Sequence, residues 1–353
     1  MIKNNFAPIE TIISVAKKGG MFILVDDEKR ENEGDLVISS SDTNSKNINF
    51  MAKYGRGLIC LALDSLQAKK LNLSLMSPVN QSRNNTAFTI SIEAKKGITT
   101  GISAKDRART IKIASKRNVK KNEIVSPGHV FPIIAKDGGV LVRAGHTEAS
   151  VDISRLAKKN NSAVICEIMN EDGTMARGQN LFNFAKKHKL KIAKIEDLIS
   201  HRLRNEKLIK CISSKKIKIK KFGSFDLKTF KNKLDGSEHY SITKGKFNKN
   251  KPSRVRVIST NVINSLLNFN KDVYKSSLKH LNKFNTFALI LIKGTNFNPT
   301  SSENNKILRY YGIGAQIIKE LRIKNMILVS RTKKRIIALK GYGIKITKQE
   351  IIK

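Results

Sequence analysis

The chain has 353 residues and a formal net charge of +40 at pH 7, and this length predicts two domains, each able to bury its own core. No apolar run is long enough to span a membrane and the N-terminus lacks a signal-peptide pattern, so neither a membrane protein nor a secreted one is expected. The three cysteines, Cys60, Cys166 and Cys211, are too far apart for a disulfide framework or a zinc knuckle, which favours the reducing cytoplasm.

Helical and strand patterns alternate through the first 200 residues. We expect helices at residues 6–20, 48–54, 64–71, 149–160, 179–188 and 196–204, and strands at 21–25, 36–38, 57–63, 87–92, 140–142, 163–166 and around residue 192. Polar loops repeatedly follow apolar strands. This order predicts an α/β or α+β fold with one site built from several loops.

The stretch from Asp26 to Asp35 holds six carboxylates in ten residues. Apolar runs flank it, and short apolar runs between polar turns are typical of buried strands, so the carboxylates are expected on a loop at a strand end. Like charges this close repel one another unless a cation compensates them. The stretch fits either a metal- and substrate-binding loop or a solvated acidic turn, and spacing alone favours the solvated turn.

Two further loops carry weaker signals. Residues 97–103 are rich in glycine and hydroxyl groups before a predicted helix, which suits either an anion held by backbone amides or a plain turn. Residues 126–133 form a predicted turn that holds His129 between two prolines. A lone loop histidine is more often a surface residue than a catalyst.

A third loop follows the predicted strand at 140–142. Arg143, the loop amides and Thr147 can hold a phosphate from three directions, because arginine offers a forked contact. His146 lies between them, where it can bind a metal. Thr147 can equally serve as the N-cap of the next helix, and both interpretations can hold together.

Six stretches, in order, resemble 3,4-dihydroxy-2-butanone 4-phosphate synthase, a lyase of riboflavin biosynthesis. They are DDEKRENEGD (26–35), FTISIEA (88–94), GITTG (97–101), PGHVFP (127–132), RAGHTEA (143–149) and DGTMAR (172–177). The resemblance spans about residues 6–204 and assigns the acidic stretch to a site. It implies a synthase-type mixed sheet with helices, and a homodimer with sites near the subunit interface. The implied reaction splits D-ribulose 5-phosphate into formate and L-3,4-dihydroxy-2-butanone 4-phosphate with Mg²⁺ or Mn²⁺.

The same resemblance assigns roles to individual residues. Glu31 and His146 are the implied metal ligands, and His129, Glu167 and Asp35 the implied catalytic groups. A hard divalent cation takes few protein ligands, which leaves room for substrate hydroxyls. Asp35 is our candidate for removing the proton, with Glu167 as a second acid or base. The implied substrate-binding residues are Arg30, Glu31, Asp35, Arg143, Ala144, Gly145, His146, Thr147 and Glu167.

The second half of the chain is much more basic. Residues 1–200 carry 32 Lys and Arg against 20 Asp and Glu, whereas residues 201–353 carry 36 against 8. Such a surplus can indicate nucleic-acid binding. The lysines are scattered among Ile and Asn rather than arranged along one face, and no RNA-binding aromatic motif accompanies them, so a nucleic-acid partner is not expected.

Residues 207–221 are predicted to be a linker or a first strand, and the segment beyond them resembles GTP cyclohydrolase II. The resemblance rests on residues 223–225, 239–245, 254–257, 311–318 and 340–344. We therefore predict a synthase domain at 1–205 and a smaller α+β cyclohydrolase II-like domain at 206–353.

This second domain departs from the family at its catalytic positions. The family's zinc needs three closely spaced cysteines, whereas residues 222–353 contain none and Ile258–Asn261 replace a His-Ser-Glu-Cys stretch. The Gln-Glu-Gly-Arg loop has no counterpart between Asn285 and Glu303, and Ile307 replaces the acid before Arg309. Without thiolates no zinc-activated water forms, so no zinc and no cyclohydrolase activity are expected. A structural module is favoured over a basic binding module.

Overall fold

The computed structural model describes residues 6–28, 30–82, 84–248, 250–260, 271–293, 303–332 and 342–352. The chain separates into two compact units, residues 1–199 with 298–302 and residues 200–297 with 303–353. Within the described part, no helix is both long and apolar enough to cross a membrane. The division falls inside helix α7 (Ile195–Asn205), and the boundary at 205/206 stays a prediction.

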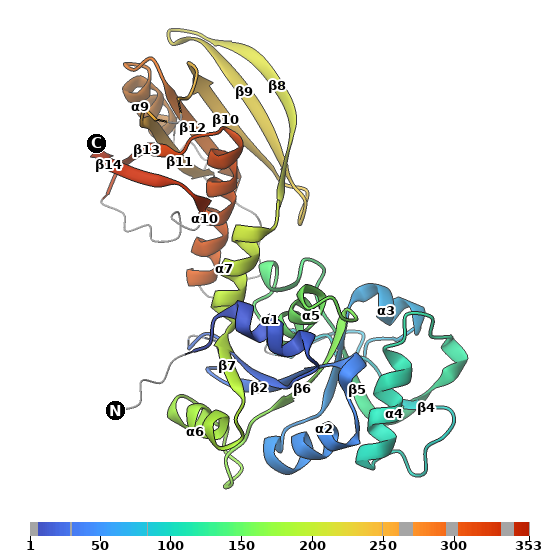
Figure 1. Cartoon of the computed structure of the whole chain (residues 1–353). Helices are drawn as coiled ribbons and strands as arrows, with labels where there is room; N and C mark the ends of the chain where they lie inside the picture. The colour runs from blue at the N-terminus through green and yellow to red at the C-terminus, as the bar shows by residue number, and fades with distance from the viewer. Residues whose placement is uncertain are drawn as a thin grey trace. The chain divides into compact units, whose positions relative to one another are not determined.

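A seven-stranded mixed sheet in the order β4-β5-β3-β6-β2-β1-β7 forms the centre of the first unit (Figure 1). Its strands pair antiparallel except for β1 with β7 and β3 with β5, which are parallel. Strands β1 and β2, which both have neighbours on either side in the sheet, are buried along their whole length, as continuous apolar runs require. The strands are β1 (Phe22–Val25), β2 (Gly34–Ser39), β3 (Cys60–Leu63), β4 (Ile92–Ala94), β5 (Ile124–Ile134), β6 (Ser162–Glu167) and β7 (Lys191–Lys194).

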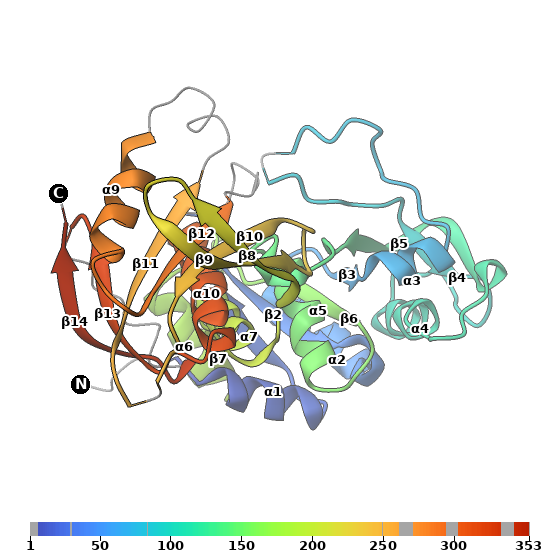
Figure 2. The ribbon, with the colours of Figure 1, turned by 90° about the horizontal axis from the view of Figure 1, so that it is seen from above.

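Helix α5 packs across β1, β2, β3 and β6, and α1 packs against α5. Helix α2 packs against α4, and Figure 2 shows α3 and α4 at the β4–β5 end of the sheet. The helices are α1 (Ile9–Lys17), α2 (Ser45–Phe50), α3 (Ser65–Lys70), α4 (Ala104–Ala114), α5 (His146–Leu156) and α6 (Gln179–Lys187), with 3-10 turns η1 (Ser40–Asp42), η3 (Lys121–Glu123) and η4 (Gly139–Leu141) and a π-helical turn η2 (Met51–Gly55).

Three local predictions for this unit were wrong. Residues 126–133 belong to the long strand β5 rather than to a turn, because its two ends pair with different neighbours, β4 and β3. Residues 140–142 are not a strand: most of them form η4, where Asp152 accepts a hydrogen bond from the Val140 amide at 2.9 Å. Residues 87–92 form isolated bridges ahead of the short strand β4 rather than one strand.

The second unit is built on another seven-stranded sheet, in the order β14-β13-β11-β12-β10-β9-β8. Its core includes Phe225, Phe287 and Leu289. Its elements are β8 (Ile209–Ile219), β9 (Gly223–Asn232), β10 (Glu238–Lys244), β11 (Ser253–Thr260), β12 (Phe287–Lys293), β13 (Asn325–Ser330), β14 (Lys345–Ile351), α9 (Lys271–Leu281) and α10 (Glu303–Glu320). The predicted architecture, a synthase-type mixed sheet with helices followed by a second α+β domain, is confirmed.

Candidate active site

The acidic stretch forms the loop between β1 and β2, and it is folded around its first residue rather than solvated. Asp26 is 5% exposed. Its carboxylate accepts hydrogen bonds from the Glu33 amide at 2.9 Å and from the Arg30 guanidinium at 2.5 Å. Arg30 also contacts Glu31 at 2.5 Å. The chain's own arginine therefore supplies part of the compensation that packed carboxylates require.

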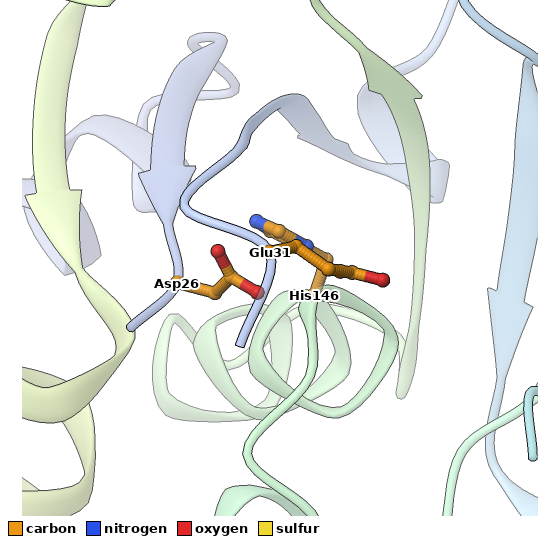
Figure 3. A group of neighbouring side chains, drawn as sticks. All are labelled: Asp26, Glu31 and His146. Carbon is orange, nitrogen blue, oxygen red and sulfur yellow. The ribbon is translucent and has the colours of Figure 1, made fainter. Parts of the chain in front are cut away.

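The loop brings Glu31 and Asp26 to the start of α5, where His146 lies (Figure 3). One ligand atom of each of these three residues lies within 4.8 Å of the other two. The Nε2 atom of His146 is buried without a hydrogen-bond partner. Burial, with a smaller effect of Arg30, lowers the pKa of His146 to about 3. A neutral imidazole with an unpaired nitrogen beside two carboxylates is a donor set that fits a divalent cation.

Asp35 and Glu167 lie opposite each other across the antiparallel pair of β2 and β6. Burial, the Glu167 carboxylate and further acids raise the pKa of Asp35 well above its usual range, and burial also raises that of Glu167. The Leu58 amide donates to Glu167 Oε2 at 2.9 Å. Gly57 permits this approach, because a Cβ there would lie 2.6 Å from both the carbonyl oxygen and Oε2 of Glu167. Asp35 Oδ1 is 3.7 Å from Nδ1 of His146, so the carboxyl pair adjoins the candidate metal ligands.

Arg143 is placed beside the site, but other residues already occupy much of its guanidinium. It donates to Glu148 at 2.7 Å, and to the Asn84 carbonyl and the Thr86 hydroxyl at 3.1 Å each. The forked contact expected for a phosphate is thus partly used to join α5 to residues 84–86. Helix α5 has Gly145 as its N-cap, so the interpretation of Thr147 as the cap was wrong.

The remaining residues of the 143–147 loop are also placed at the site. Ala144 is 8% exposed and Thr147 is 4% exposed. A Cβ on Gly145 would lie 2.6 Å from the Arg143 guanidinium. A side chain at position 145 would therefore have to displace the Arg143 guanidinium.

His129 contacts a different residue from the ones predicted to act with it. Its side chain is 43% exposed and pairs with Glu93 at 2.6 Å. His129 lies on β5 and Glu93 on β4. The structure brings four of the predicted site residues together: Glu31, Asp35, His146 and Glu167. His129, in the same unit, is paired with Glu93 instead. Gly101 packs against this pair, since a Cβ there would meet the Glu93 carboxylate and His129.

The amides of the glycine-rich loop at 97–103 bind a carboxylate of the chain itself, that of Asp106. Asp106 accepts hydrogen bonds from the amides of Thr99 and Gly101, at 3.2 and 3.1 Å, and from the Thr99 hydroxyl at 2.7 Å. These hydrogen bonds lower the pKa of Asp106. The turn interpretation therefore describes this loop.

Sequence reasoning did not single out Asp26, Asn84 or Glu148 as site residues. Asp26 directly follows β1, and an acid at the end of a buried strand was the signal that could have indicated a site residue. Asn84 donates a short hydrogen bond to Glu31, which is 53 residues away in the sequence. Glu148 is 1% exposed and accepts a hydrogen bond from Arg143. No pattern in the sequence predicts either contact.

In the second unit, two histidines are engaged in structural contacts. His239 is fully buried in β10 and accepts a hydrogen bond from the Lys293 amide at 3.2 Å, and His280 pairs with Glu350 at 3.5 Å. The predicted departures at Asn261 and within 294–302 lie outside the described residues, as do the side chains of Ile307 and Arg309. Among the residues that are described, the group able to hold a metal is Asp26, Glu31 and His146.

In this mixed α/β unit, a buried histidine and acids can hold a cation next to two carboxyls of raised pKa. These features define a metal-dependent enzyme with acid–base groups. A family model for 3,4-dihydroxy-2-butanone 4-phosphate synthase matches residues 10–201, and one for GTP cyclohydrolase II matches residues 210–350. The chain belongs to the 3,4-dihydroxy-2-butanone 4-phosphate synthase family, with a cyclohydrolase II-type unit after the synthase unit.

Similar proteins cover both units. Riboflavin biosynthesis protein RibBA of Aquifex aeolicus is 41% identical over 99% of this chain and 93% of that protein. The crystal structure of RibBX, a two-domain 3,4-dihydroxy-2-butanone 4-phosphate synthase from A. baumannii, is 37% identical with a TM-score of 0.81, covering 98% of this chain and 99% of that one. A structure of a synthase with two magnesium ions is 37% identical with a TM-score of 0.55, covering 57% of this chain and 98% of that one. The chain is thus an enzyme of riboflavin biosynthesis.

Proposed function

We propose that the first unit converts D-ribulose 5-phosphate into formate and L-3,4-dihydroxy-2-butanone 4-phosphate. The observation that carries the proposal is the group of Asp26, Glu31 and His146 beside the carboxyl pair of Asp35 and Glu167. We also propose that the enzyme works in the cytoplasm, which its free cysteines support.

Glu31 and His146 are the proposed ligands of Mg²⁺ or Mn²⁺, and Asp26 is close enough to join them. The magnesium-bound synthase structure supports the choice of metal. When bound, such a cation polarises the sugar carbonyl and makes the neighbouring C–H more acidic.

Asp35 is the proposed base for that proton. A carboxyl whose pKa is raised is a stronger base once ionised, and burial beside Glu167 raises the pKa of Asp35. Glu167, held by the Leu58 amide, is the proposed second acid or base. Arg30 and residues 143–147 are the proposed contacts to the sugar and its phosphate.

Formate release from ribulose 5-phosphate in the presence of Mg²⁺ tests the reaction. Glu31→Gln and His146→Ala should each abolish turnover while the circular dichroism spectrum stays native, because each removes a ligand from a site with few. Glu28→Gln is the matched control, since Glu28 is an exposed acid of the same loop and should keep full activity. Near-native turnover of either ligand variant at limiting metal would show that the metal assignment is wrong.

We propose a homodimer in which His129 of one subunit acts at the site of the other. Its exposure, and its pairing with Glu93 rather than with the site residues, support this arrangement. Mixing two inactive variants, His129→Ala and Glu31→Gln, should restore about a quarter of the parent activity, because half of the random dimers then contain one intact site of two. Mixtures that stay inactive, although size-exclusion chromatography shows subunit exchange, would contradict the shared site.

For the second unit we propose a structural role without cyclohydrolase chemistry. The absence of cysteine from residues 222–353 and the structural pairing of His239 and His280 support this proposal. Incubation of the chain with GTP, zinc and magnesium should give no formate and no diaminopyrimidine. Turnover that disappears on deletion of residues 206–353 would overturn it, and salt-dependent RNA capture by that fragment would favour a basic binding module instead.

A further inference from the structure

The first unit contains a cavity that lies outside the candidate active site. Its volume is about 330 Å³, and it lies between the π-helical turn η2 and helix α6. Small-molecule sites in proteins begin at about this size. Figure 1 shows α2, which leads into η2, and α6 at the same end of the unit.

The backbone on one side of this cavity is unusual. A π-helical turn is rare and is found preferentially at functional sites. Here its C-cap is Arg56, a non-glycine residue with φ of +69°, a conformation that persists only where surrounding contacts hold it. The Arg56 guanidinium donates to the Met169 carbonyl at 3.1 Å, which ties the turn to the chain just after β6.

Aromatic rings line the cavity from both sides. Tyr54 of η2 and Phe184 of α6 each lie against His188, with ring centroids 4.7 and 4.5 Å apart. Burial and the neighbouring Lys187 lower the pKa of His188. The rings are tilted by 48° and 46° to His188 rather than stacked on it, and the exposed part of an aromatic ring can bind a planar heterocycle.

The other lining groups are cations and amides. Lys53 and Lys187 line the cavity together with Arg56, and the one acid among the lining residues is Glu171. Glu171 is 82% exposed and 3.5 Å from Arg56, so it forms at most a weak surface pair. Three side-chain amides, Asn170, Asn180 and Asn183, complete the wall. Asn180 donates to Asn170 at 3.2 Å and Asn183 accepts from Gln179 at 2.9 Å, so the Asn180 carbonyl and the Asn183 amide nitrogen are the groups that can hydrogen-bond the edge of a base.

We propose that this cavity binds a mononucleotide, with the base against Tyr54 and Phe184 and the phosphate near Lys53 and Lys187. Rings alone suit any apolar ligand, and lysines alone suit any anion. Their combination with amides in one cavity selects a ligand that has a flat polar ring and a phosphate. This inference does not depend on the proposed lyase reaction.

Isothermal titration of the full-length protein with AMP, GMP, CMP and UMP tests the proposal. At least one of them should bind in a salt-sensitive manner, and the matching nucleoside and inorganic phosphate should each bind about tenfold or more weaker, since stacking and charge each contribute on that scale. Failure of all four to bind at millimolar concentration would overturn the site.

Two matched pairs of variants on α6 locate the binding. Phe184→Leu should weaken nucleotide binding about tenfold, whereas Phe182→Leu should not, because Phe182 packs on Phe6 and does not line the cavity. Lys187→Glu should weaken it at least tenfold, whereas Lys186→Glu, one residue away and exposed, should leave it nearly unchanged. Binding that is equally insensitive to both lining variants places the nucleotide elsewhere and refutes the proposal.

Discussion

Arg143 joins helix α5 to residues 84–86, so replacing it with lysine should loosen this part of the unit as well as weaken substrate binding. Lysine keeps a positive charge for Glu148 but cannot also reach the Asn84 carbonyl and the Thr86 hydroxyl, both at 3.1 Å from Arg143. Each lost hydrogen bond is worth about 0.5–1.5 kcal/mol. The two together should lower the local stability by about 1–3 kcal/mol.

Amide hydrogen exchange of α5 peptides measures this loss within the first unit. A decrease of about 1–3 kcal/mol accelerates exchange roughly 5- to 150-fold, and the Michaelis constant for ribulose 5-phosphate should rise in the same variant. Arg155→Lys on the same helix is the control, because its side chain is 41% exposed and its contact to Asp152 is 3.5 Å long. Unchanged hydrogen exchange in Arg143→Lys would show that Arg143 does not join α5 to residues 84–86. An unchanged Michaelis constant would show that Arg143 does not contact the substrate.

Burial and Glu167 raise the pKa of Asp35, so the unfolded chain ionises first and stability falls as pH rises from about 4 towards the folded-state pKa. Asp35→Asn should therefore raise the melting temperature of the metal-free protein at pH 7 and flatten its decline above pH 4, while turnover is lost; a melting temperature equal to or below the parent's would contradict this. Saturating Mg²⁺, at about 100 times its dissociation constant, should raise the melting temperature of the first unit by roughly 5–10 °C, and Glu31→Gln should remove most of this shift. Gly57→Ala should lower turnover roughly 100-fold, because the new Cβ would lie 2.6 Å from Glu167 and displace it; parent-like turnover would show that the position of Glu167 is not critical.

The local signals in the sequence that were correct are those that depend on short-range chemistry. The apolar runs on either side of the acidic stretch form β1 and β2. The helix expected at 64–71 forms α3, and Asp64 caps it through a 2.8 Å hydrogen bond from the Gln67 amide. The prediction that failed at β5 concerns a segment whose conformation is set by strand partners far along the chain, and the one at η4 concerns a segment held by Asp152, 12 residues further on.

By itself, the sequence determined the family, the two-unit organisation and the carboxylates, histidine and arginine available for chemistry, because motif order and hydrophobic pattern are properties of the chain. Only the tertiary structure decided how those groups affect one another. It placed Asp35 opposite Glu167, left His146 Nε2 without a partner, and used much of Arg143 for Glu148 and residues 84–86. The physical reason is that pKa values and hydrogen bonding depend on burial and on neighbours that folding brings together from distant parts of the chain, which no local pattern encodes.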